Sequence, residues 1–265
     1  APVNLYRGQP RSILSAMIDV HAHLTDASFS GDLPRVLERA RAAGVRKIVT
    51  SITDPGELAK ALQVVESSPG YVYLTVGFDP SSLSAEKYSE FSGIVYRHRA
   101  SLLGIGEVGL DHFYIRDHSE RAIQEGFFRA SIRLAKSLDL PLVVHSRSAG
   151  RRALEVLLSE GVERVLMHAF DGRASDALAA AKSGYLFSIP ASVVFSVQKQ
   201  KLAKALPLES IALETDSPVL SPVRGERNEP ANVMESARAI SGIKKLALEE
   251  VIEATTANAR RLFRF

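Results

Sequence analysis

The chain has 265 residues, of which 46% are hydrophobic and 24% are charged, a balance typical of a globular protein with a sizeable core. This excludes a mini-protein and a disordered chain. Lys and Arg number 33 against 30 for Asp and Glu, and the net charge of +3 permits a polyanionic partner without requiring one. Cysteine is absent, which excludes disulfides and thiolate chemistry and fits a reducing compartment such as the cytoplasm.

Because the chain has seven histidines and no cysteine, any transition-metal site must use imidazoles and carboxylates. No uncharged apolar run reaches the roughly 18 to 20 residues that span a bilayer, so we expect no membrane-spanning helix. Residues 1–16 contain no apolar stretch of signal-peptide length, and we interpret them as an extended or disordered leader. We expect one domain over residues 17–265.

From Met17 onward, short apolar runs alternate with longer segments of helical period, as in βα units. We expect eight strands, at residues 18–24, 46–52, 71–77, 102–110, 140–146, 164–170, 184–190 and 210–216. The first helix is expected to bury Leu33, Val36, Leu37 and Ala40. A longer helix is expected to bury Ile123, Phe127, Ala130, Leu134 and Leu138. The segment 244–265 is expected to form terminal helices that close the barrel.

Residues with known preferences mark the helix ends. Asp54 and residues 81–84 provide N-cap side chains, and the helices are expected to end at Gly44, Gly70, Gly161 and Gly184. Eight parallel strands fit a closed barrel or an open doubly wound sheet. The length matches the barrel, and HAHLTD stands where an open nucleotide-binding sheet would carry its glycine fingerprint. We therefore predict an α/β fold, a single-domain (β/α)8 TIM barrel.

The first strand ends with two histidines, His21 and His23. Residues two apart on a strand point to the same face, so these imidazoles are expected to converge as a chelating pair, although a chance pair of half-buried histidines is the alternative. The fourth strand carries Glu107 inside an apolar, glycine-rich run. A buried carboxylate needs a cation or several donors, so we interpret Glu107 as a bridging metal ligand, with an arginine-paired structural role as the alternative.

Three further strands end in groups that can bind metal. His145 ends the fifth strand, His168 the sixth and Asp216 the eighth, although Asp216 also suits a turn. Because barrel enzymes place their chemistry at the carboxyl ends of the strands, these side chains are expected to meet His21, His23 and Glu107. Four imidazoles and two carboxylates suit two divalent ions that share one ligand. The remaining histidines, His98, His112 and His118, are expected outside this cluster.

Five motifs together resemble the TatD family of metal-dependent deoxyribonucleases, within the amidohydrolase-like barrel superfamily. They are HAH at residues 21–23, GEVGLD at 106–111, HSR at 145–147, HAFDG at 168–172 and ETDSP at 214–218. The resemblance extends from Ile18 almost to the end of the chain. It implies a hydrolase that cleaves DNA phosphodiester bonds with divalent ions, and single strands or ends are the expected substrate.

The resemblance also implies roles for the six residues. His21, His23 and Asp216 are expected to hold one ion, His145 and His168 the other, and Glu107 to bridge them. Glu107 and Asp216 are the expected catalytic residues, with Asp216 accepting a proton from the attacking water. The ligand set accommodates Zn, Mn, Ni or Mg, and neither the ion nor the oligomeric state follows from the sequence.

Substrate phosphates need additional cations, for which guanidinium has matching geometry. Arg147 is the first candidate because it follows His145 by two residues, and Arg227 and Arg224 come next, although both also suit ordinary loop charges. Asp111 and Asn228 are expected at the rim without an assigned role. No membrane and no obligate protein partner are implied.

One position departs from the family pattern. After the third strand the family has G-x-H-P, whereas this chain has Asp79 in place of the histidine, and an anionic side chain facing the substrate would repel phosphate. The alternative function is therefore a C–N, ester or lactone hydrolase acting on a small molecule. Many such enzymes bridge their metals with a carbamylated lysine, and no lysine stands at a predicted strand end. A non-catalytic barrel is a third possibility, but it predicts lost ligands.

Overall fold

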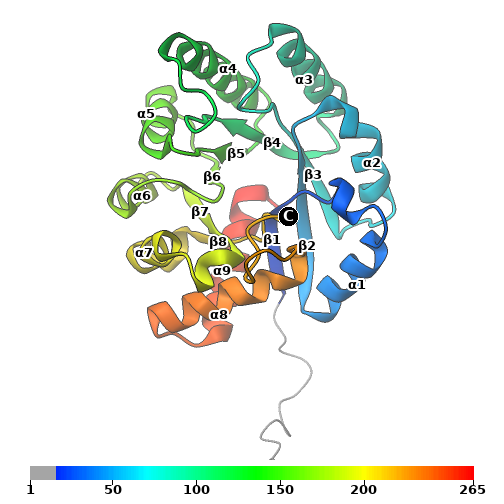
Figure 1. The fold of residues 1–265 in the computed structure, drawn as a ribbon, viewed down its shortest axis with the longest axis vertical. Coiled ribbons are helices and arrows are strands. Elements are labelled where there is room, and N and C mark those ends of the chain that lie inside the picture. The colour runs from blue at the N-terminus through cyan, green and yellow to red at the C-terminus, as the bar shows by residue number, and fades with distance from the viewer. Residues whose placement is uncertain (1–15) are drawn as a thin grey trace, which may run out of the picture.

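The computed structural model describes residues 16–265, so the predicted leader, apart from Ala16, lies outside the described residues. Eight parallel strands follow one another around a single sheet with helices outside them (Figure 1). They are β1 (Met17–Ala22), β2 (Val45–Ile52), β3 (Val72–Val76), β4 (Leu102–Gly109), β5 (Leu142–His145), β6 (Val165–Met167), β7 (Leu186–Ile189) and β8 (Ile211–Leu213). The predicted (β/α)8 barrel is confirmed.

Helices connect the strands and end the chain. They are α1 (Leu33–Ala42), α2 (Leu58–Glu66), α3 (Ala85–His98), α4 (His118–Ser137), α5 (Gly150–Glu160), α6 (Ala174–Ala181), α7 (Val197–Ala205), α8 (Val233–Lys244) and α9 (Leu248–Phe263). Short 3-10 turns are η1 (Ala27–Phe29), η2 (Pro55–Glu57), η3 (Ala191–Val194), η4 (Leu208–Ser210) and η5 (Pro230–Asn232). Within residues 16–265, no helix combines the length and hydropathy that a bilayer crossing requires.

The barrel closes where the segment after β8 meets β1. The Asp216 amide donates to the His21 carbonyl at 2.9 Å, just beyond the end of β8. Farther inside, the fully buried Asp19 carboxylate accepts from the Thr215 amide at 2.9 Å and from its hydroxyl at 2.6 Å. These bonds fix the carboxyl ends of the first and last strands beside each other, so ligands from both can share one site.

The opposite, amino-terminal end of the barrel is closed by α9. This helix packs Ala259, Leu262 and Phe263 against strand side chains of the barrel interior, among them Ile18 of β1. Asn258 donates to the carbonyls of residues 208 and 211 at the start of β8, at 2.8 Å each. Because these apolar contacts close the amino-terminal end, the carboxyl-terminal end is the polar, open end of the barrel.

The predicted buried stripe of α4 is partly wrong. Ile123 is 49% exposed, whereas Gln124, Phe128 and Ile132 are buried, so the inner face is rotated by about one residue near the start of the helix. The sequence pattern missed this because the inner position holds a polar residue, Gln124. Its amide finds a buried acceptor, donating to the Pro80 carbonyl at 2.6 Å.

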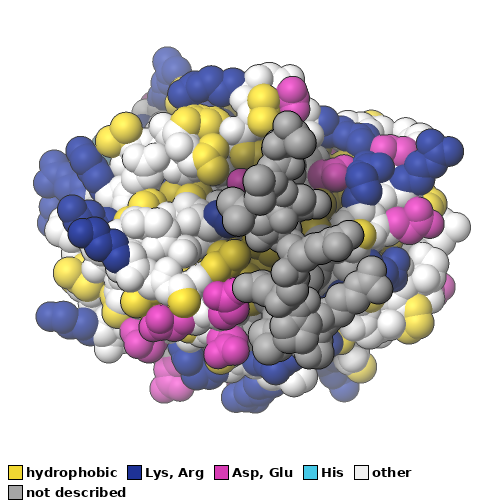
Figure 2. All heavy atoms as spheres, turned by 90° about the horizontal axis from the view of Figure 1, so that it is seen from below, with side chains coloured by type: hydrophobic (Ala, Val, Ile, Leu, Met, Phe, Trp, Pro, Cys, Tyr) yellow, Lys and Arg dark blue, Asp and Glu magenta, His cyan; other side chains and the backbone are white. Residues whose placement is uncertain are grey.

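The helix-end predictions agree better with the structure. Asp54 accepts from the Gly56 amide, and Ser84 caps α3 by accepting from the Lys87 amide. The four predicted terminal glycines all have positive φ, which residues with a side chain rarely adopt. On the face shown in Figure 2, basic and acidic side chains are intermixed. This face carries no continuous basic surface.

Candidate metal centre

The two histidines of the first strand converge. His21 is fully buried and His23 stands just past the end of β1, with 3.2 Å between their Nε2 atoms. Each Nδ1 faces residue 51 of β2: that of His21 lies 3.2 Å from the Ser51 hydroxyl, and that of His23 lies 3.2 Å from the Ser51 carbonyl. Supporting groups therefore occupy both outer nitrogens, and both Nε2 atoms face the same point.

Glu107 reaches this point from β4 because the neighbouring backbones approach closely. A Cβ atom at Gly77 would lie 2.1 Å from the Glu107 carbonyl oxygen, and one at Gly109 would lie 2.0 Å from that of His145. Only glycine fits at these two positions, which explains why glycines surround the acidic residue. One Glu107 oxygen, Oε2, lies 3.5 Å from His21 Nε2 and 3.6 Å from His23 Nε2.

His145, at the end of β5, lies between two carboxylates. Its Nδ1 is 2.5 Å from Glu107 Oε1, and its Nε2 is 2.9 Å from Asp111 Oδ2. Asp111 is buried and its second oxygen accepts backbone amides, so its orientation is fixed. Asp111, which the sequence analysis placed at the rim, therefore contacts a candidate metal ligand.

His168 follows β6 and is oriented by a residue that the sequence analysis did not select. Glu214 is fully buried, and its carboxylate contacts His168 Nδ1 at 2.7 Å while accepting from the Ser188 hydroxyl at 2.7 Å and the Ala169 amide at 2.9 Å. A carboxylate behind a histidine fixes the tautomer that leaves Nε2 free for metal. The sequence signal that selected Glu107, an acidic residue at the end of an apolar strand, would also have selected Glu214.

Asp216 completes the cluster after β8. Its Oδ1 lies 3.4 Å from His23 Nε2, 3.6 Å from His21 Nε2 and 3.8 Å from His168 Nε2. These separations exceed those of good hydrogen bonds, so the atoms surround a common space. Ligand atoms about 2.1 Å from a tetrahedral ion lie about 3.4 Å apart, which is the spacing found here. The side chains present therefore fit a divalent cation.

Three overlapping sets of side chains could each hold an ion. They are His21, His168 and Asp216; His21, His23 and Glu107; and Glu107, His145 and His168. All six ligands predicted from the strand ends belong to at least one set, and Glu107 belongs to two. The structure thus brings together every residue that the sequence assigned to metal.

The charges of the cluster compensate one another. Burial opposes ionisation of Glu107, but the imidazoles around it, above all His145, outweigh burial and hold the pKa of Glu107 well below its usual range. Burial disfavours the imidazolium form of His168, but the neighbouring carboxylates, led by Glu214, outweigh it and raise the pKa to about 10. Protons on the imidazoles thus balance the carboxylates, and metal binding would displace such protons.

A sequence model described as TatD related DNase matches residues 18–264. Human deoxyribonuclease TATDN3 is 43% identical over 258 residues, covering 93% of this chain and 94% of the human protein. The Bacillus subtilis metal-dependent hydrolase YabD is 34% identical, covering 94% of this chain and 99% of the relative. The chain belongs to the TatD family. It is accordingly a metal-dependent hydrolase.

The structure of a TatD homologue from Escherichia coli, YjjV, shares this fold. It superimposes with a TM-score of 0.86 at 26% identity and covers 95% of this chain and 99% of the E. coli chain. The predicted family and barrel are therefore confirmed by sequence and by structure.

The metal cluster opens into a cavity of about 470 Å³. Its walls include five of the six candidate metal ligands, together with Arg147, Lys199 and the apolar pair Val219 and Leu220. Lys199 of α7 was not predicted here; its buried ammonium donates to the carbonyls of Ala169 and Phe170 at 2.7 and 2.8 Å, and burial lowers its pKa. Because both bonds engage the Lys199 amine with backbone carbonyls, and Glu107 already lies among the histidines, we do not assign Lys199 the carbamylated bridge of other barrel hydrolases.

The three predicted phosphate-binding arginines differ in their surroundings. The Arg147 guanidinium lines the cavity and stacks 3.9 Å from the centre of the Phe113 ring. Arg224 stacks 4.1 Å from the centre of the Phe195 ring. Arg227 makes a two-point ion pair with Asp32 at 2.8 and 2.7 Å. Of the three, Arg147 is the one that lines the metal cavity.

The two remaining predicted residues have structural partners. Asp79 is exposed and accepts from the Ser81 amide and hydroxyl, at 2.8 Å each, and it does not line the metal cavity. The expected repulsion of phosphate by Asp79 therefore loses its geometric basis. Asn228 is fully buried and donates to the carbonyls of Thr215 and Val219 at 2.8 Å each, so it holds the loop after β8.

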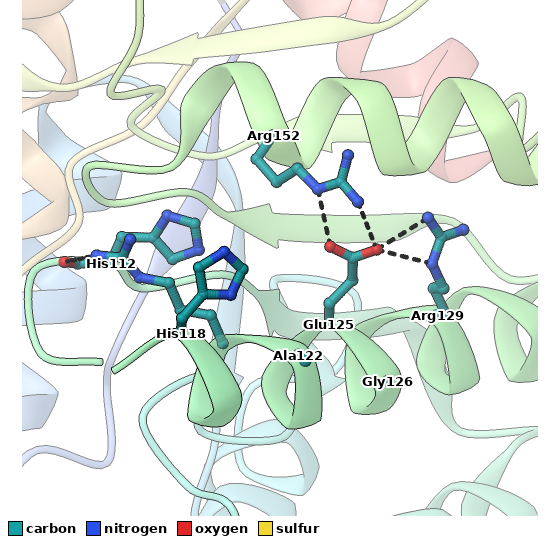
Figure 3. A pocket seen from close by; sticks show the side chains of 8 residues that line it. His112, His118, Ala122, Glu125, Gly126, Arg129 and Arg152 are labelled. Atoms are coloured by element: carbon teal, nitrogen blue, oxygen red, sulfur yellow. Dashed lines mark hydrogen bonds and ion pairs between the residues drawn. The ribbon is translucent and has the colours of Figure 1, made fainter. Parts of the chain in front are cut away.

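A second and larger hollow lies between α4 and α5. It has a volume of about 590 Å³ and is lined by His112, His118 and three arginines. Figure 3 shows Glu125 of α4 between Arg152 of α5 and Arg129 of α4, bonded to both. This hollow contains none of the three metal-binding sets.

Proposed function

We propose that this TatD-family chain hydrolyses phosphodiester bonds of DNA, acting on single strands or strand ends with two divalent ions. The observation that carries the proposal is the space on which four imidazoles and two carboxylates converge, where three of the imidazole Nε2 atoms lie 3.4 to 3.8 Å from the nearest oxygen of Glu107 or Asp216. The family and the printed activity of the human relative support DNA as the substrate.

Each residue has a role in this proposal. His21, His23 and Asp216 would hold one ion, His145 and His168 the second, with Glu107 shared. Ions bound there supply Lewis acidity that lowers the pKa of water and offsets charge on the phosphate oxygens. Asp216 accepts the proton of the attacking water through its carboxylate.

Behind these groups, fixed partners hold the ligands in place. Glu214 orients His168, and the Ser51 hydroxyl orients His21. Arg147 binds a phosphate oxygen of the substrate, because its guanidinium lines the same cavity and lies on an aromatic ring instead of in an ion pair.

Single strands and ends are favoured by the shape and charge of the site. A cavity of about 470 Å³ has the size that receives one small group, such as a terminal nucleotide. Among the described residues, Arg147 is the one arginine that lines this cavity, so we expect attraction of DNA to depend on the ions and on Arg147.

The decisive experiment removes all metal and adds back Mg, Mn, Ni and Zn separately. Each form is assayed on a 3′-labelled single strand, on the matching duplex, and on a panel of esters, lactones and amides. Glu107→Ala is the inactive control, and metal content is measured for every sample. We expect cleavage of the single strand with at least one ion, a slower reaction on the duplex, and loss of both with Glu107→Ala.

Three results decide against the proposal or one part of it. Failure of every metal form to cleave either DNA, combined with turnover of an ester or amide, would assign the site to a small-molecule hydrolase. Equal rates on duplex and single strand would remove the preference for single strands while leaving the nuclease activity. A ratio of one ion per chain at full activity would overturn the two-ion arrangement.

A further inference from the structure

Two large aromatic side chains stand exposed beside the metal cavity. Phe113 and Tyr114, in the loop between β4 and α4, are 43% and 63% exposed. Their rings are 5.1 Å apart in an edge-to-face arrangement. The other exposed aromatic side chain among residues 16–265, Tyr96, stands alone on α3. Adjacent exposed rings leave apolar surface in water that a bound planar group would cover.

One carboxyl group connects this aromatic pair to the metal centre. Asp111 Oδ1 accepts the amides of Phe113 and Tyr114, at 2.9 Å each, while its Oδ2 lies 2.9 Å from His145 Nε2. The backbone that carries the two rings is therefore fixed relative to a candidate metal ligand.

Further bonds hold the rest of the loop. The Arg121 side chain donates to the carbonyls of Ile115 and His112, and the His112 amide donates to the Arg147 carbonyl at 2.9 Å. A loop fixed at this many points presents its exposed side chains without a large loss of conformational entropy on binding.

The two rings are not equivalent. The Arg147 guanidinium lies 3.9 Å from the centre of the Phe113 ring and 5.2 Å from that of Tyr114. Phe113 therefore supports the arginine, and the more exposed Tyr114 ring offers a surface for a ligand. A cation that lines the metal cavity and an adjacent free ring match a nucleotide, which joins an anionic phosphate to a planar base.

We infer that Tyr114, supported by Phe113 and Arg147, is the surface on which a nucleobase of single-stranded DNA stacks beside the phosphate that is cleaved. This inference rests on the proposed function and adds to it a base-binding group that would select unpaired nucleotides. Stacking is tolerant of sequence because every base has an aromatic face, so we expect little preference among the four bases.

The first test compares variants on a single-stranded oligonucleotide. Tyr114→Ala is expected to raise KM about tenfold with kcat within about twofold, because a stacking contact is lost while the metal centre is kept. Tyr114→Phe retains the ring and should behave as the wild type. Tyr96→Ala, at the exposed aromatic residue on α3, is the matched control and should have no effect. For an oligonucleotide with abasic sites beside the cleaved bond, the wild type and Tyr114→Ala should have the same KM.

The second test measures binding without turnover. The chain contains no tryptophan, so Tyr114→Trp introduces a single fluorescent reporter at the proposed surface, and Tyr96→Trp provides the same reporter on α3. Each is combined with Glu107→Ala to prevent cleavage. We expect a single-stranded oligonucleotide to quench the indole fluorescence of the Tyr114→Trp variant but not that of the Tyr96→Trp variant. An abasic strand of equal length should quench neither variant.

The outcomes separate this inference from the proposed function. If the wild type cleaves no DNA with any ion, the proposed function fails. If it cleaves DNA but Tyr114→Ala has unchanged KM, or if abasic and normal strands quench equally, the stacking surface fails alone. A changed sedimentation coefficient of Tyr114→Ala, with DNA binding intact, would assign the rings to contact between two copies of the chain and overturn the inference.

Discussion

The metal cavity and the α4–α5 hollow both collect charged side chains, but they satisfy those charges differently. In the hollow, Glu125 accepts directly from Arg129 and Arg152 at 2.8 to 3.0 Å, near the surface. In the cavity, the Nε2 atoms of three imidazoles remain 3.4 to 3.8 Å from the nearest carboxylate oxygen of Glu107 or Asp216, whereas the fourth imidazole, His145, is bonded to carboxylates of the site. The larger hollow holds completed ion pairs, and the smaller cavity holds donors arranged around a space.

This difference shows that neither volume nor charge identifies the site. The hollow has about 590 Å³ against about 470 Å³ for the cavity. What distinguishes the cavity is that its imidazoles and carboxylates converge on one space and are balanced by protons that a bound metal would displace.

The sharpest test of the comparison exchanges one glutamate for glutamine in each region. Glu107→Gln is expected to lower kcat/KM about 1000-fold, because the shared ligand loses its charge in the buried cluster. Glu125→Gln should leave kcat/KM within about twofold and reduce the free energy of unfolding by less than about 1 kcal/mol, as for a partly exposed ion pair. Steady-state kinetics and denaturant titration measure both effects. Equal losses of activity would show that the hollow takes part in the reaction.

The sequence placed the six candidate ligands together, as the structure does, because the carboxyl ends of parallel strands meet at one end of a barrel. The ends of β1, β5 and β6 therefore placed His21, His145 and His168 together once the strands were known. The local pattern fails where a partner is distant: Asp32 is 195 residues from Arg227, and no local signal links them. The pattern also failed for α4, where buried Gln124 occupies an inner position that periodicity assigns to an apolar residue.

A second test concerns the carboxylate that orients His168. Glu214→Gln is expected to lower metal affinity 10- to 100-fold, because the neutral amide no longer fixes the imidazole tautomer or strengthens it as a ligand. Titration against a competing chelator measures the affinity. Excess metal should restore much of the activity, and Glu125→Gln should bind metal as the wild type does. An unchanged affinity would limit Glu214 to a role in packing.

A third test compares the two arginines. Arg147→Met keeps an apolar stem against Phe113 but removes the charge, so kcat/KM for DNA is expected to fall about tenfold or more. Arg227→Met removes a charge already paired with Asp32 and should change kcat/KM less than about twofold, with a small decrease in Tm. A larger effect at Arg227 would mean that its ion pair opens and that the loop after β8 contacts the substrate.

The smallest expected effect is a pH dependence that differs between metal-free and metal-loaded protein. Although burial disfavours the charged forms of His23 and His145, their carboxylate partners raise both pKa values to about 9, and that of His168 reaches about 10. Unfolded histidine has a pKa of about 6.5. The stabilisation from these imidazoliums is therefore complete below about pH 6.5 and is lost as the pH rises through 9 to 10.

Bound metal reverses this trend, because it requires unprotonated imidazoles and so binds more tightly as the pH rises. Thermal unfolding between pH 6.5 and 9.5 should show Tm falling by a few degrees in the presence of a chelator, while the difference from the metal-loaded protein widens. Glu125→Gln should retain this divergence, since none of the candidate metal ligands lines the hollow. If the Tm of the protein with chelator rises over this range, protons do not substitute for metal in the cluster. The contrast between the metal cavity and the hollow would then depend on the interatomic distances alone.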